Sequence, residues 1–239
     1  MSQERDVTRR PGPGARHALS VFIALVGMSF LGYPVLLNAL YDREVAIMRQ
    51  RFDESATRWR EKAGDAVFWF MRSENERLFQ TGQAGLIDAF SYETTAIDLM
   101  RYGIEDGLIG FVAVPSAGID LPVYLGANVE NMRKGAAHLT QTSYPVGGED
   151  TNTVIAAHRG GTRAMFRDIH HIALGDDLVV TTAWGTLRYE VVEIQIIAPD
   201  EIDRVKIQAG RDLVTLISCN PLGGNHQRYV VYGERISDG

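Results

Sequence analysis

Three side chains with complementary chemistry stand at the ends of apolar segments. Cys219, the only cysteine, follows the apolar run LVTLIS and precedes Asn-Pro, which stops a strand. His158 follows the apolar run VIAA, and Arg228 precedes the run YVVY. A thiolate can attack an amide, a histidine can carry the proton, and an arginine can stabilise the oxyanion. Three such residues at the strand ends of one barrel would suit nucleophilic catalysis if they converge on one pocket.

The alternative is that Cys219 is a structural residue buried in the core, which is common for a free thiol. A single cysteine excludes an intrachain disulfide and a cysteine-rich metal site. The net charge of −6 argues against a nucleic-acid binder driven by overall basicity.

Beyond Gly107 the hydrophobic pattern has a period of two, which is typical of strands separated by Gly, Pro, Asn and Asp. Trp184-Gly185 is expected to close a hairpin, and short helices are expected over 128–134 and 163–169. Seven or eight strands in about 130 residues indicate a mainly β fold, a closed or nearly closed β-barrel. The expected strands are 108–114, 119–124, 153–157, 177–183, 186–197, 213–218 and 228–236.

The segment 18–41 contains 24 residues without a charge, enough to span a bilayer as a helix. Arginines outnumber acidic residues in the preceding tail, so the positive-inside rule predicts a cytoplasmic N-terminus. A cleaved signal peptide is the alternative, but its apolar region would be shorter and would end in a small-residue cleavage site. We therefore expect a single-pass membrane protein with its catalytic domain outside the cytoplasm.

Apolar residues recur every three or four positions from 45 to 70, which predicts an amphipathic helical region up to about residue 80. A surface loop is expected over 81–94, followed by a short helix around Thr95 to Tyr102. The predicted organisation is a tail (1–17), a transmembrane anchor (18–41), a helical region (42–107) and a β-barrel domain (108–239).

The motifs TLISCNP, with Arg228 nine positions after Cys219, and VIAAHRG resemble those of the sortase family. The run from Asp106 to Arg235 is similar to class C sortases, the pilin polymerases of Gram-positive bacteria. This resemblance implies a sortase-type β-barrel and a cysteine transpeptidase with Cys219 as nucleophile, His158 as acid–base and Arg228 as oxyanion donor. It implies cleavage of an LPXTG-like signal, a thioester, transfer to a pilin lysine, and no metal or other cofactor.

The sequence departs from the family pattern at several positions. Ser218 replaces the usual Thr before the cysteine, and His226 lies one place earlier than the His that many class C members have before the arginine. Class C enzymes often carry a lid with an Asp-Pro-aromatic motif, and the segment 86–91 has Ala where Pro would be. Asp88 and Phe90 are the corresponding lid candidates, in a backbone less restrained without Pro.

Two other function classes remain open. A housekeeping sortase would use the same chemistry to attach surface proteins to a peptidoglycan amine. A non-enzymatic anchored barrel would bind an extracytoplasmic partner and bury Cys219.

Several other residues are interpreted as structural. His138 is expected to be a structural residue, and Arg159 a charge on a loop. Adjacent histidines on a helix point apart, so His170 and His171 are not expected to bind metal. The class C resemblance argues against a calcium site.

Overall fold

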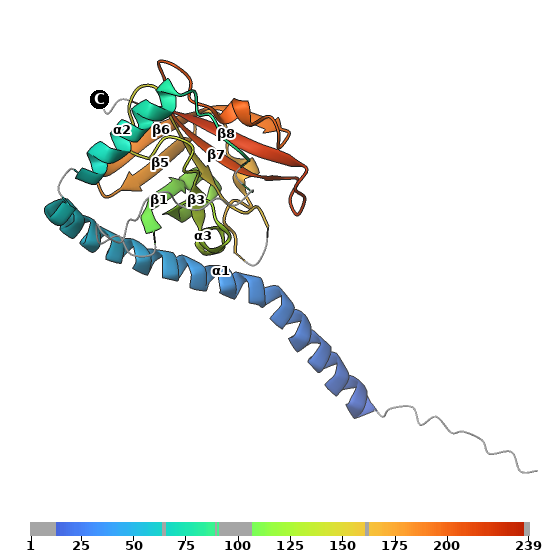
Figure 1. Cartoon of the computed structure of the whole chain (residues 1–239). Helices are drawn as coiled ribbons and strands as arrows, with labels where there is room; N and C mark the ends of the chain where they lie inside the picture. Colours follow the sequence, from blue (N-terminus) through green and yellow to red (C-terminus); the bar gives the residue numbers. More distant parts are fainter. Residues whose placement is uncertain (1–12, 64–65, 89, 91–106, 161–162, 237–239) are drawn as a thin grey trace, which may run out of the picture. The chain divides into compact units, whose positions relative to one another are not determined.

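The computed structural model describes residues 13–63, 66–88, 90, 107–160 and 163–236, and we describe its two units, 1–41 and 42–239, separately (Figure 1). The predicted short helix near 95–102 lies outside the described residues.

The long helix α1 (Pro13–Ala63) begins in the first unit and continues into the second. Within it, Leu19–Glu61 contains an 18-residue window with a mean hydropathy of 2.0, none of which is buried. It is the one helix in the described part of the chain that is long and apolar enough to cross a membrane. Its composition is consistent with the predicted anchor.

The second unit contains a closed barrel of eight strands in the order β1-β2-β3-β4-β7-β8-β6-β5, which confirms the predicted fold class (Figure 1). Short helices connect some of the strands: η4 (Pro115–Ala117), α3 (Val129–Lys134), η5 (Ile169–His171) and η6 (Ile202–Val205). The strands are β1 (Leu108–Val114), β2 (Ile119–Leu125), β3 (Ala136–His138), β4 (Thr151–Ala156), β5 (Asp177–Thr182), β6 (Gly185–Ile197), β7 (Asp212–Asn220) and β8 (Gln227–Arg235).

The strand register brings the ends of β4, β7 and β8 together. β4 runs parallel to β7, with Ala156 opposite Ile217. β7 runs antiparallel to β8, with Cys219 opposite Arg228. Because β4 and β7 point the same way, the residues that follow them emerge at one end of the barrel, where β8 begins.

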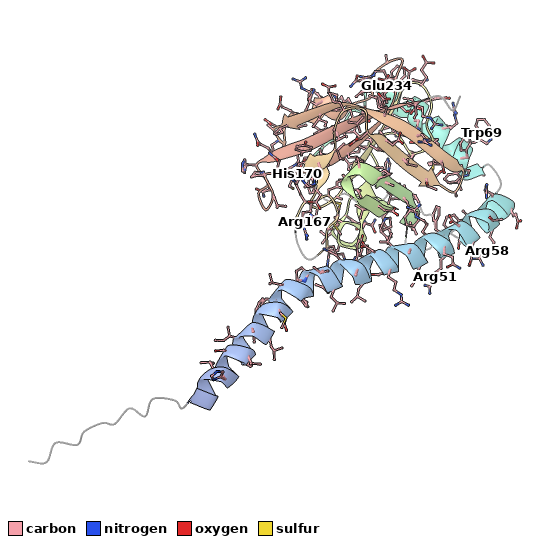
Figure 2. The ribbon with its side chains drawn as sticks, turned by 180° about the vertical axis from the view of Figure 1, so that it is seen from behind. Arg51, Arg58, Trp69, Arg167, His170 and Glu234 are labelled. Carbon is pink, nitrogen blue, oxygen red and sulfur yellow. The ribbon has the colours of Figure 1, made fainter. Side chains whose placement is uncertain are left out.

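The predicted amphipathic stripe packs on the barrel through α1. Val45, Phe52 and Ala56 are buried, and the Phe52 ring meets Phe111 of β1 edge-on with centroids 5.4 Å apart. The polar positions face outward, as Arg51 does in Figure 2.

A second helix, α2 (Ala66–Gln80), has a buried face of its own. This face contains Val67, Met71, Asn75 and Leu78, whereas Phe70 in the predicted stripe is 37% exposed. The predicted stripe is thus confirmed at Val67 but not at Phe70.

Three local predictions also differ from the structure. The three-residue strand β3 was not predicted, and 163–169 does not form the expected helix: residues 165–168 form turns, and η5 begins at Ile169. The predicted surface loop after α2 is partly internal, since Gln83 is 3% exposed and Leu86 is buried. A loop that carries buried residues packs as part of the domain.

Candidate active site

Cys219 and Arg228 face each other across the β7–β8 ladder. Cys219 is half-buried near the end of β7, and Arg228, at the start of β8, is 5% exposed. Arg228 Nη1 lies 3.9 Å from Cys219 Sγ and also donates to the backbone carbonyl of Asn225 at 2.7 Å. The guanidinium is thus fixed beside the sulfur.

His158 lies two residues beyond β4, at the same end of the barrel. The backbone N–H of Ala157 donates to the carbonyl of Ile217 at 3.3 Å, which continues the β4–β7 pairing. The Ser218 hydroxyl donates to the Ala157 carbonyl at 2.7 Å, so the hydroxyl retained at this position joins the two strand ends. Ala157 is thus hydrogen-bonded to the two residues of β7 that precede Cys219, and this places His158, the next residue, near the cysteine.

The two lid candidates contact this site. Asp88 accepts two hydrogen bonds from Arg228, from Nε to Oδ1 and from Nη2 to Oδ2, both at 2.8 Å. The Phe90 ring centroid lies 4.9 Å from the Arg228 guanidinium and 6.1 Å from the His158 ring. Ala89, between them, lies outside the described residues.

A side-chain hydrogen bond shapes the backbone between the two lid candidates. The Phe90 N–H donates to Asp88 Oδ2 at 3.3 Å, as in an Asx turn. The Ile87 N–H donates to the side-chain oxygen of Gln141 at 3.1 Å. These bonds restrain the segment without a proline ring.

The environment keeps both reactive groups neutral near pH 7. Burial raises the pKa of the Cys219 thiol; Arg228 opposes this shift and the Asp88 carboxylate adds to it. Burial lowers the pKa of the His158 imidazole. A neutral thiol is a poor nucleophile, so Cys219 must lose its proton before it can attack a carbonyl carbon.

Arg159 lies on the loop after β4, as predicted, but it is buried there, with only 8% exposed. Its Nη1 donates to the side-chain oxygen of Asn220, the residue after Cys219. Its guanidinium lies 5.1 Å from the ring centroid of Tyr229, the residue after Arg228. The sequence analysis did not predict these contacts of Arg159. The only indication in the sequence was the position of an arginine directly after the candidate histidine.

The remaining histidines lie in different environments. His138 is fully buried in β3, and its Nε2 lies 2.9 Å from the Ser143 carbonyl oxygen. His226 is exposed. The expectation that His170 and His171 point apart was wrong, because their ring centroids are 4.1 Å apart.

Residues 112–236 match the model of the family described as the sortase domain. The chain belongs to the sortase family. The chain is 27% identical over 131 residues to Sortase D of Bacillus subtilis, covering 54% of this chain but 64% of that protein. It is 28% identical over 244 residues to Sortase SrtE2 of Streptomyces coelicolor, covering 95% and 86%. Against the first curated relatives, the matched segment thus spans less than two thirds of their length.

Solved structures give the subclass of the neighbours. The chain resembles Sortase C1 of group B Streptococcus (GBS) Pilus Island 1 with a TM-score of 0.70 and 29% identity, covering 80% of this chain and 98% of that one. Its structural neighbours are class C pilus sortases.

Proposed function

We propose that this sortase is a membrane-anchored cysteine transpeptidase that joins pilin subunits. The observation that carries the proposal is the approach of Arg228 Nη1 to within 3.9 Å of Cys219 Sγ, at the barrel end where His158 also emerges. A buried core cysteine would have no need of a guanidinium beside it.

In the proposed reaction, Cys219 Sγ attacks the carbonyl carbon of an LPXTG-like sorting signal after its proton passes to His158. Arg228 N–H groups stabilise the oxyanion. His158 then protonates the leaving amine as the C–N bond breaks, which leaves a thioester. An acceptor amine attacks the thioester, gives its proton to His158 and displaces the sulfur.

Asp88 and Phe90 act in this proposal as a lid that keeps the enzyme at rest. Asp88 occupies two N–H donors of the Arg228 guanidinium, at Nε and Nη2. An oxyanion would need these donors. Asp88 must therefore leave before Arg228 can serve the reaction. The apolar stretch 18–41 would anchor the chain with its N-terminus in the cytoplasm, facing the catalytic domain toward membrane-held pilins.

Four variants test the assignment of the site. Cys219→Ala should abolish cleavage of an LPXTG-type peptide. His158→Ala and Arg228→Ala should each lower kcat by about 100-fold or more, the scale for losing proton transfer or an oxyanion donor. Arg228→Lys should rescue little, because an ammonium lacks the planar fork. Full activity in any of the alanine variants would remove that residue from the proposed machinery.

The acceptor is tested in the producing cell. Deletion of the gene should replace an SDS-resistant ladder of covalent pilin polymers with monomers, while other wall-anchored proteins stay attached. Membrane confinement of enzyme and pilin raises their effective concentration, which lets a lysine compete with water. An intact ladder with general loss of anchored proteins would instead favour the housekeeping sortase, with a peptidoglycan amine as acceptor.

A further inference from the structure

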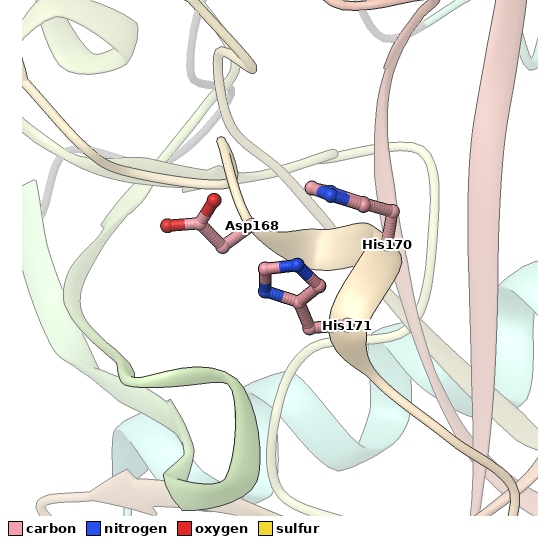
Figure 3. A group of neighbouring side chains, drawn as sticks. All are labelled: Asp168, His170 and His171. Carbon is pink, nitrogen blue, oxygen red and sulfur yellow. The ribbon is translucent and has the colours of Figure 1, made fainter.

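A turn between β4 and β5 gathers two imidazoles and a carboxylate outside the candidate active site. Asp168, His170 and His171 each offer one ligand atom, and these atoms all lie within 4.8 Å of one another. Figure 3 shows the three side chains grouped at η5, with Asp168 directly before the helix. The histidines are exposed, so an ion from solvent can reach them.

The short helix η5 explains why adjacent histidines converge here. In a 3-10 helix, residues i and i+3 eclipse each other, which places His171 over Asp168. The His171 N–H donates to the Asp168 carbonyl at 2.9 Å and closes this turn. The His170 ring then lies beside the His171 ring at an interplanar angle of 43°.

The Asp168 carboxylate does not serve its usual role at this position. An aspartate at a helix N-cap ordinarily accepts a backbone N–H, yet the Asp168 side chain makes no cap hydrogen bond. One carboxylate oxygen lies within 4.8 Å of a nitrogen of each imidazole.

We propose that Asp168, His170 and His171 bind a divalent transition-metal ion of the Zn²⁺ class. Two imidazole nitrogens and one carboxylate oxygen form a ligand set that Zn²⁺ uses, with bonds of about 2.0–2.2 Å. The three ligand atoms now lie within 4.8 Å of one another, and side-chain rotation must bring them closer for one ion to bind all three. Mg²⁺ and Ca²⁺ prefer oxygen ligands alone, so the site discriminates against them.

A metal ion bound at this turn would stabilise the chain segment that follows His158. The Phe166 N–H donates to the His158 carbonyl at 3.0 Å, two residues before the metal-binding turn begins. An ion bound by the folded turn stabilises the folded state by mass action. The proposal does not depend on the reaction proposed above.

The test uses the full-length chain in detergent, without a histidine tag, in a Cys219→Ala background that removes the thiol as a competing ligand. Calorimetric titration with Zn²⁺ should give one ion per chain and a higher Tm, and Mg²⁺ should give neither. Adding His171→Ala should weaken binding about 10-fold or more, since even supporting residues of metal sites have effects of this size.

Asp168→Asn keeps the shape of the side chain and removes its charge, and it should weaken binding as well. His17→Ala is the matched control, because it removes a histidine elsewhere in the chain and should leave the affinity unchanged. Absence of Zn²⁺ binding, or equal affinity in the parent, His171→Ala and Asp168→Asn chains, would overturn the proposal.

Discussion

At the scale of single residues, two opposite charges act on one thiol. Burial raises the pKa of Cys219 most; Arg228 acts against this shift, and Asp88, paired with that arginine, adds to it. The pair is mostly shielded from solvent, with the Arg228 and Asp88 side chains 6% and 20% exposed. Asp88 thus occupies two N–H donors of Arg228 and disfavours the Cys219 thiolate at the same time.

This coupling predicts the pH dependence of alkylation. Removing the negative charge in Asp88→Asn should lower the pKa of Cys219, because the anion then loses a repulsive neighbour. The midpoint of iodoacetamide labelling against pH should move to lower pH, and labelling at neutral pH should be faster. Asp177→Asn, which alters an exposed carboxylate on β5, is the control. A midpoint unchanged in Asp88→Asn would contradict the coupling.

The reactive residues of the candidate site were predictable from the sequence, but the neighbouring residues that hold the strand ends together were not. Cys219, His158 and Arg228 stand at strand ends that the hydrophobic pattern reveals. Arg159 is typical of a loop surface by residue type, and its burial depends on Asn220 and Tyr229, which only the folded strand ends bring together.

At the scale of elements, the lid segment depends on a buried glutamine. Gln83 Nε2 donates to the Gln141 carbonyl at 3.1 Å, and its Oε1 accepts from the Ile207 N–H at 2.7 Å. Leu86 and Phe90 then pack on the barrel core. The lid is therefore attached to two connections of the barrel before it reaches Arg228.

Gln83→Ala should loosen this attachment, since it leaves two partly buried backbone groups without their Gln83 partner. We expect faster alkylation of Cys219 with little change in the labelling midpoint, because the Asp88 charge is retained. Gln80→Ala, at an exposed position of α2, should label like the parent chain. Labelling of Gln83→Ala at the parent rate would mean that Gln83 does not hold the lid.

The elements themselves were predictable to the extent that they are long and periodic. The strands of seven or more residues were found from alternation, whereas β3 has three residues, all buried, and offers no period. Residues 163–169 contain apolar side chains at helical spacing, but backbone bonds such as Arg167 N–H to Ala164 carbonyl close turns instead. Short elements depend on tertiary contacts that a sequence pattern does not contain.

At the scale of the whole molecule, the barrel contains a titratable group that links stability to pH. Burial lowers the pKa of His138 to about 4, against about 6.5 in an unfolded chain. Between these values the unfolded state binds the extra proton, so the free energy of unfolding falls as the pH falls through this window.

His138→Gln should flatten that dependence, whatever its effect at neutral pH. Urea midpoints measured between about pH 7 and about pH 4 would show it, with exposed His226→Ala as the control. An equal slope in the parent and His138→Gln chains would contradict the neutral, buried state of His138.

The most direct test of the account is the mass of the acyl-enzyme. The full-length Asp88→Ala chain, in which the lid is released, is mixed with an LPXTG-type peptide and its intact mass is measured. The account predicts an added acyl fragment ending at the threonine, attached to Cys219, removable by hydroxylamine and absent when Cys219 is also alanine. Peptide cleavage that proceeds in that Cys219→Ala chain, or an acyl group found on another residue, would contradict it.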